Sequence, residues 1–236
     1  MIAESAVRGH AGGPTVGIRW PSHPFIQAVI TACDFPLAAP SANPSNQLSP
    51  TNANHVQKFF GNKIKLIVDG GQSQIGIEST VLDLSVSPPR LLRPGMIHEP
   101  ALLAVTGELA VGTHEASNIL KSPGQLPRHY SPKAKLLVLS WEADSDLQTQ
   151  ITLNASRITH PASSSTVHII SHTHIPSVSG FGRVSVIPHD PEAFARAIYA
   201  ELHQCDEAGA ELIIVEALPE THEWRAIADR LKRAAT

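Results

Sequence analysis

The polar loop at residues 38–51 carries the side chains best suited to binding a small ligand. Ser41, Asn43 and Ser49 offer uncharged hydrogen-bond donors and acceptors, and their small neighbours let a ligand come close to the backbone. The Asn43-Pro44 step favours an extended or turn geometry over a helix. Such a loop after a short apolar run is typical of nucleotide and substrate sites in α/β proteins, although a cluster of this kind, taken alone, is more often ordinary turn chemistry.

Two hydrolase interpretations fail on spacing. Glu78 and Asp83 could suggest a paired-carboxylate hydrolase, but along a strand they lie on opposite faces and do not converge. Ser41 or Ser79 could act with a histidine, but the sequence has no Gly-x-Ser-x-Gly nucleophile elbow. The sequence therefore predicts neither class of hydrolase.

Metal chemistry is also disfavoured. Among the 13 histidines, His168, His172 and His174 lie close together, but no His-Glu-x-x-His or Cys/His pairing accompanies them. Cys33 and Cys205 are far apart and fall within predicted helices, so they form neither a metal-ligand pair nor a disulfide framework. We therefore expect no bound metal, and two inert thiols of the kind usual in cytoplasmic proteins.

The composition is that of a globular protein. The chain has 236 residues, enough for one large domain or two small ones. Its formal net charge of −3 does not favour tight binding to nucleic acid or to a membrane surface. No apolar run is long enough to cross a bilayer, and residues 1–13 lack the apolar core of a secretory signal. We therefore expect a cytoplasmic location and no membrane partner.

The N-terminal part is predicted to mix short strands and helices. One helix begins after Ser22, which can cap it, and runs to Cys33. A second begins at Thr51-Asn52 and stops at Gly61. Its apolar side is expected to contain Val56, Phe59 and Phe60. The other expected elements are strands at 15–20, 37–39, 64–68, 79–84 and 90–92, and a helix at 99–105.

The C-terminal part follows a stretch at 113–133 that has the composition of a linker. Asp190 can cap a long amphipathic helix, and the apolar run at 212–215 is typical of a central parallel strand. Strands alternating with helices predict a small Rossmann-like parallel α/β domain, but no Gly-x-Gly-x-x-Gly indicates a dinucleotide. The expected strands are 136–139, 167–170, 184–187 and 212–215, and the helices are 191–207 and 223–234.

Four short motifs occur in an order that is jointly specific. They are Ser41-Ala42-Asn43, Glu78-Ser79-Thr80, Arg93-Pro94-Gly95 and His129-Tyr130-Ser131-Pro132. In this order the chain resembles the threonylcarbamoyl-AMP synthase family, from about residue 14 to the last residue. The resemblance implies an α/β fold with the C-terminal portion of a YrdC-like catalytic domain at 1–112. A linker at 113–133 and a Rossmann-like domain at 134–236 would follow.

The resemblance also implies an activity. The family forms threonylcarbamoyl-AMP and pyrophosphate from L-threonine, bicarbonate and ATP, with Mg²⁺ accompanying the ATP and no tightly bound cofactor. The product supplies the downstream machinery that transfers the threonylcarbamoyl group to tRNA. Because carbamates decompose readily, the site must exclude water, and catalysis would consist mostly of positioning and charge stabilisation.

Site residues are assigned by the same resemblance, and none is assigned as catalytic. Arg93 would bind nucleotide phosphate through its two-pronged guanidinium, and Tyr130 would fold back over the site as a lid. Arg19 would hold the threonine carboxylate. The full ATP set is Thr15, Ser41, Asn43, Ser49, Arg93 and Tyr130, and the L-threonine set is Arg19, Ala39 and Ser79.

Alternatives follow from what the resemblance does not cover. Family members carry a further strand–helix half with basic residues for the triphosphate, so we expect an N-terminally truncated member with little activity of its own. A non-catalytic YrdC-like module with weak RNA binding, or an inactive fragment, is the alternative. The related carbamoyl-transfer domain of hydrogenase maturation proteins is disfavoured, because its zinc-type cysteine motifs are not found in this sequence.

Overall fold

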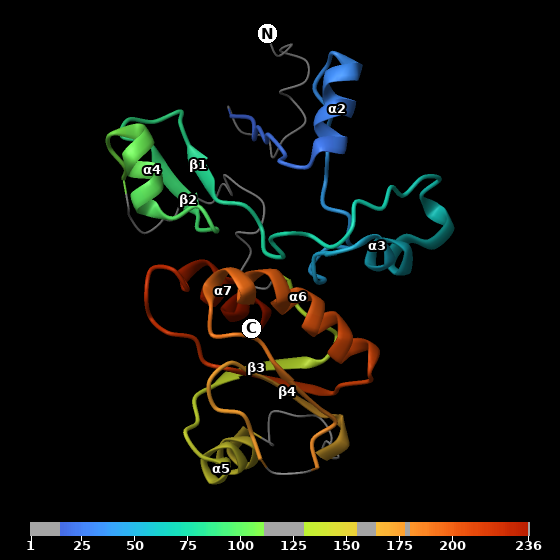
Figure 1. The fold of residues 1–236 in the computed structure, drawn as a ribbon, viewed down its shortest axis with the longest axis vertical. Coiled ribbons are helices and arrows are strands. Elements are labelled where there is room, and N and C mark those ends of the chain that lie inside the picture. The colour runs from blue at the N-terminus through green and yellow to red at the C-terminus, as the bar shows by residue number, and fades with distance from the viewer. Residues whose placement is uncertain (1–14, 111–129, 155–163, 178–179, 236) are drawn as a thin grey trace.

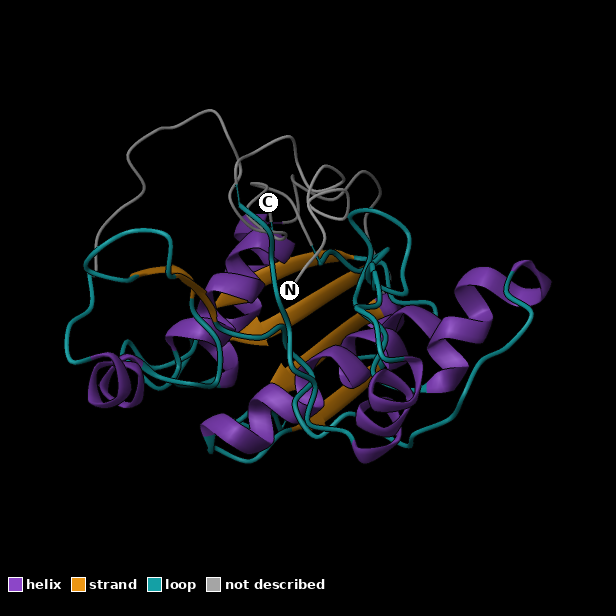
Figure 2. Cartoon of the chain, turned by 90° about the horizontal axis from the view of Figure 1, so that it is seen from above, coloured by secondary structure: helices purple, strands orange, loops and turns teal. Residues whose placement is uncertain are grey.

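A four-stranded parallel sheet organises the C-terminal part of the computed structural model, which describes residues 15–110, 130–154, 164–177 and 180–235. Figure 2 shows the strands side by side. Every residue of β6 is buried in the middle of the sheet, as the apolar run at 212–215 predicted. The spatial order is β3 (Lys135–Leu139), β6 (Leu212–Glu216), β4 (Val167–Ser171) and β5 (Arg183–Val186). The predicted Rossmann-like parallel arrangement is therefore confirmed.

Helices cover both faces of this sheet (Figure 1). α6 (Pro191–Glu207) and α7 (Arg225–Ala234) pack on one face, and α5 (Asp144–Asn154) packs on the other. α6 has the predicted bounds, and the Asp190 carboxylate accepts a 2.8 Å hydrogen bond from the backbone N–H of Ala193. We refer to residues 135–235 as the parallel-sheet unit.

The N-terminal segments, residues 15–110, contain less regular structure. α2 (Pro24–Cys33) begins at His23, whose imidazole accepts from the backbone of Phe25, so the predicted cap at Ser22 is wrong. A two-stranded antiparallel sheet and three further helices complete the segments. Short 3₁₀ helices occur at η1 (Gly61–Lys63) and, in the parallel-sheet unit, at η3 (Ser164–Thr166). The remaining elements are α3 (Ala53–Phe60), β1 (Val81–Asp83), β2 (Arg90–Arg93) and α4 (Glu99–Thr106).

Three predicted strands are absent from the described residues. The stretches 15–20, 37–39 and 64–68 have no ladder partner there, and large apolar side chains such as Trp20 and Leu66 remain 72% and 76% exposed. Apolar, β-branched residues favour extended backbone, but a strand also needs a neighbour that supplies hydrogen bonds. The sequence pattern in these stretches was therefore insufficient to predict whether a strand forms.

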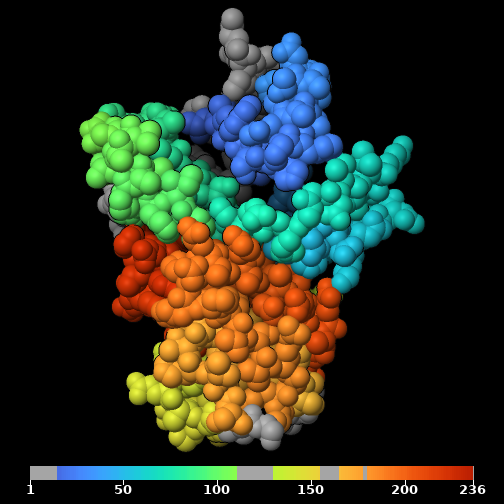
Figure 3. Space-filling model, viewed as in Figure 1, coloured from blue at the N-terminus to red at the C-terminus, as the bar shows by residue number. Residues whose placement is uncertain are grey.

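The N-terminal segments lie directly on α6 and α7 (Figures 1 and 3). Leu48 and Ile77 are 2% and 5% exposed and pack in the same apolar core as Phe194 and Ile198 of α6. The two helices are thus buried on both sides, by the sheet below and the N-terminal segments above. This layer places side chains of α6 and α7 beside the polar loops of the N-terminal segments.

Candidate functional site

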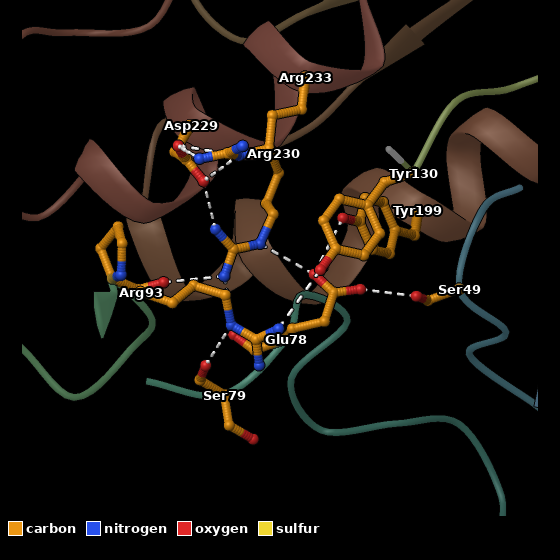
Figure 4. Close-up of polar contacts among 10 residues, drawn as sticks. Ser49, Glu78, Ser79, Arg93, Tyr130, Tyr199, Asp229, Arg230 and Arg233 are labelled. Atoms are coloured by element: carbon orange, nitrogen blue, oxygen red, sulfur yellow. Dashed lines mark hydrogen bonds and ion pairs between the residues drawn. The ribbon is translucent and has the colours of Figure 1, made fainter. Parts of the chain in front are cut away.

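Glu78 is the centre of a polar cluster between the N-terminal segments and the parallel-sheet unit (Figure 4). Its Oε1 accepts from the Ser49 hydroxyl at 2.6 Å. Its Oε2 accepts from the Tyr199 hydroxyl at 3.2 Å and from Nε of Arg230 at 2.9 Å. Tyr199 lies on α6 and Arg230 on α7, so one carboxylate joins a loop and two helices.

Arg93 ends β2 beside this carboxylate. Its Nε donates to the carbonyl oxygen of Ser79 at 3.1 Å, and Nη1 lies 3.4 Å from the Tyr130 hydroxyl. Burial lowers the pKa of Arg93, but a guanidinium stays protonated in proteins. A buried, oriented guanidinium of this kind is suited to binding a phosphate or a carboxylate through two parallel hydrogen bonds.

Tyr130 packs against the same arginine in a strained backbone conformation. Its side chain is 2% exposed and its φ is +61°, a region that bulky residues rarely adopt. The next residue, Ser131, donates its N–H to the carbonyl of Asn46 at 3.1 Å and forms a parallel bridge with Gln47. The end of the predicted linker therefore lies against the loop at 38–51, whereas residues 113–129 lie outside the described residues.

Four of the predicted site residues are brought together: Ser49, Ser79, Arg93 and Tyr130 meet around Glu78. Asn43 instead braces its own loop, because its amide donates to the carbonyl of Gln47 at 2.9 Å. Its buried Oδ1 has no hydrogen-bond partner among the described residues. The remaining predicted residues, Thr15, Arg19, Ala39 and Ser41, are exposed and make no described side-chain hydrogen bond to the cluster.

The sequence interpretation missed the partners of Glu78. The sequence suggested Asp83 as the one residue that might act together with Glu78. In the structure, Asp83 instead accepts a 2.9 Å hydrogen bond from the backbone N–H of Ser85. A usable signal was present in α7, where Arg230 shares the buried helix face with Ile227 and Leu231. A charged residue inside an apolar stripe needs a buried partner, and that partner is Glu78.

A pair of histidines lies beside the cluster. The His55 and His203 rings have centroids 3.8 Å apart, and His203 Nε2 donates to the carbonyl of Ser49 at 3.1 Å. Burial, with His203 nearby, lowers the pKa of His55 to about 4, and burial also lowers the pKa of His203. The predicted apolar side of α3 was therefore incomplete, because His55 is the residue of that helix that is buried.

The described residues contain no candidate metal site, and their cavity lies away from the Glu78 cluster. Within the described ranges, no three His, Cys, Asp or Glu side chains are arranged to hold a metal ion. A cavity of about 530 Å³ opens beside the last residues of β3 and β6, and it shares no residue with the Glu78 cluster. None of the described helices is long and apolar enough to cross a bilayer.

Comparison with known proteins decides the family. Residues 96–236 match the model described as "Threonylcarbamoyl-AMP synthase, C-terminal domain", which is more than half of the chain. The chain belongs to the threonylcarbamoyl-AMP synthase family. Residues 3–95 match a second model, described as "Telomere recombination". The resemblance inferred from the ordered motifs is confirmed.

Relatives from this synthase family match nearly the whole chain. It is 33% identical to the threonylcarbamoyl-AMP synthase of Pyrococcus abyssi, over 95% of this chain and 65% of the relative. For the Bacillus subtilis synthase, identity is 36% over 95% of this chain and 64% of the relative. The crystal structure of Sua5 from P. abyssi in complex with L-threonine matches with a TM-score of 0.77 and 32% identity, covering 95% and 65% of the two chains. The chain thus spans just under two thirds of the length of these relatives.

Proposed function

We propose that the protein takes part in the synthesis of L-threonylcarbamoyladenylate. In this reaction the amino group of L-threonine and bicarbonate form a carbamate with loss of water. A carbamate oxygen then displaces pyrophosphate from the α-phosphorus of ATP. The product would serve the machinery that modifies tRNA. Family membership and the match to a structure in complex with L-threonine support the proposal.

One structural observation carries the proposal: the Arg93 guanidinium is buried where the Ser49 loop, Ser79 and Tyr130 meet. Arg93 would bind the nucleotide phosphates, Ser79 would contact L-threonine and Tyr130 would shield the carbamate from water. The exposed residues Thr15, Arg19, Ala39 and Ser41, together with Asn43, would complete the two substrate sites. Mg²⁺ would enter as part of the nucleotide substrate.

The organisation of the chain is proposed with the function. A YrdC-like catalytic part would span residues 1–112, a linker 113–133 and a Rossmann-like domain 134–236. The parallel sheet and the contacts of Ser131 with the loop at 38–51 are consistent with this division. We also propose a cytoplasmic location, where ATP, bicarbonate and tRNA are available.

The test uses the protein purified from its native cells. It measures the formation of threonylcarbamoyl-AMP from labelled bicarbonate, L-threonine and ATP. Arg93→Ala should lower the rate about a hundredfold, because preorganised charge at the reacting phosphate supplies several kcal/mol. Arg90→Ala is the matched control, since Arg90 is exposed at the other end of β2. Equal rates for the two variants would contradict the assignment of Arg93.

A further inference from the structure

Arg230 of α7 is buried among acceptors that belong to the N-terminal segments. Its side chain is 1% exposed. Nε pairs with the Glu78 carboxylate at 2.9 Å, and Nη2 donates to the carbonyl of Pro94 at 2.8 Å. Nη1 pairs with Asp229 on its own helix at 2.6 Å. A guanidinium is thus inserted across the boundary between the parallel-sheet unit and the N-terminal segments (Figure 4).

The contacts of Arg230 flank those of Arg93. Glu78 immediately precedes Ser79, whose carbonyl accepts from Arg93, and Pro94 immediately follows Arg93. Arg230 and Arg93 therefore connect the same two chain segments, 78–79 and 93–94. Loss of either contact of Arg230 would loosen a segment that holds Arg93: 78–79, whose Ser79 carbonyl accepts from it, or 93–94, its own end of β2.

Charge balance points the same way. The Glu78 carboxylate lies close to both guanidinium groups, and Arg230 and Arg93 repel each other. Burial alone would lower the pKa of Arg230, but Glu78 and other neighbours raise it, so the pair is electrostatically favourable. Removing one partner of a buried pair leaves the other charge without compensation.

We propose that Arg230 is a positioning residue that lets the parallel-sheet unit hold Arg93 in place through Glu78 and Pro94. This assignment rests on the proposed function, in which Arg93 binds the phosphates of ATP. The parallel-sheet unit would therefore be needed for the geometry of a site built mainly from the N-terminal segments.

The test compares Arg230→Lys with Arg233→Lys on the same helix. Lysine keeps the charge but cannot reach the Glu78 carboxylate and the Pro94 carbonyl with a fixed planar fork. Arg233 is the matched control because it lies on the same helix and pairs with Asp229, one turn before it, while the contacts to Glu78 and Pro94 belong to Arg230. We expect kcat to fall about a hundredfold for Arg230→Lys, with a smaller change in the KM for L-threonine, since small displacements of positioned groups cost that much. Arg233→Lys should retain the parent rate.

A purely structural role would give a different result. If Arg230 acts through Arg93, adding Arg230→Lys to an Arg93→Ala protein should cause little further loss of rate. Amide hydrogen exchange should speed up within residues 76–83 and 90–97 and stay unchanged in β6. Additive losses, or exchange that increases throughout the protein, would overturn the proposal.

Two further results keep the proposal separable from folding and from the proposed function. Should Arg230→Lys not fold, Tyr199→Phe removes one hydrogen bond to Glu78 and should give the same local exchange with a smaller loss of rate. The same rate as the parent protein, with unchanged exchange, would then count against positioning. If the parent protein makes no adenylate while local exchange still responds to Arg230→Lys, the proposed function fails and the bracing of Arg93 stands.

Discussion

The hydroxyl of Ser49 donates its hydrogen to Glu78 across 2.6 Å. A hydroxyl has one hydrogen to donate, so Ser49 is left to face a ligand as an acceptor. Ionised phosphate oxygens are also acceptors, which makes Ser49 better suited to a ribose hydroxyl or an adenine amino group. This narrows the ATP contact expected from the sequence for Ser49.

Glu78→Gln tests how much this carboxylate stabilises the fold. The substitution removes the carboxylate that faces the buried Arg230 across the boundary and leaves only Asp229, on its own helix, to balance it, so the free energy of unfolding should fall by about 3 kcal/mol. Urea denaturation measures it, with the exposed Glu223→Gln as the control. Equal unfolding midpoints for the two variants would mean that Glu78 and Arg230 do not stabilise the fold as a pair.

The His55–His203 pair predicts acid sensitivity. The pKa of His55 is about 4 in the folded protein and near 6.5 when unfolded, so the unfolded chain binds more protons between these values. His203 is shifted in the same direction. The stability that this neutral pair contributes should therefore be fully present above about pH 6.5 and should be lost as the pH drops toward 4.

Urea midpoints measured across this pH range check the prediction. His55→Gln should flatten the dependence, because the glutamine does not titrate. His222→Gln, at an exposed position, should leave the slope unchanged. A parent protein that is equally stable at both ends of the range would contradict a role for the histidine pair.

Tyr130→Phe isolates the hydroxyl that faces Arg93. The ring is retained, so packing is preserved while the hydrogen bond to a charged group is lost, which is worth about 2 kcal/mol. We expect ATP to bind up to about thirtyfold more weakly, as measured by calorimetry. Tyr130→Ala should in addition raise hydrolysis of ATP without product. Unchanged affinity and hydrolysis in both variants would reject the lid role.

Asp190→Ala removes the cap of α6. Its carboxylate accepts from the backbone of Ala193, and loss of such a cap typically costs about 1 kcal/mol. Glu192→Ala, in the same first turn but exposed, is the control. Thermal unfolding should show a lower midpoint for the first variant and a smaller change for the second.

Local signals explain what could be read from the sequence. α6 follows from Asp190, Pro191 and an apolar face, and β6 follows from an uninterrupted apolar run. α5 was not predicted, because Leu147 is its one buried residue among those described, and a single apolar position gives almost no helical periodicity. The strands expected at 15–20, 37–39 and 64–68 failed because strand formation depends on partners that a local pattern does not reveal.

The site was predicted in part for the same reason. Ser79, Arg93 and Tyr130 belong to short motifs that a family resemblance identifies. The bond between Glu78 and Arg230 joins residues 152 positions apart, and no spacing rule connects them. The sequence of α7 has the pattern of an ordinary amphipathic helix. The position of Arg230 on the buried face is the feature that indicates a distant carboxylate.

The order of strands in the sheet has a consequence for synthesis on the ribosome. β6 lies between β3 and β4, yet it is made after both. A growing chain that has not reached Leu212 has β3 and β4 without their common neighbour, so their apolar edges are exposed. The sheet can close only when β6 emerges, and the Arg230 brace comes later still. Chaperone binding should therefore be most needed after β4 has emerged from the ribosome and before β6 has.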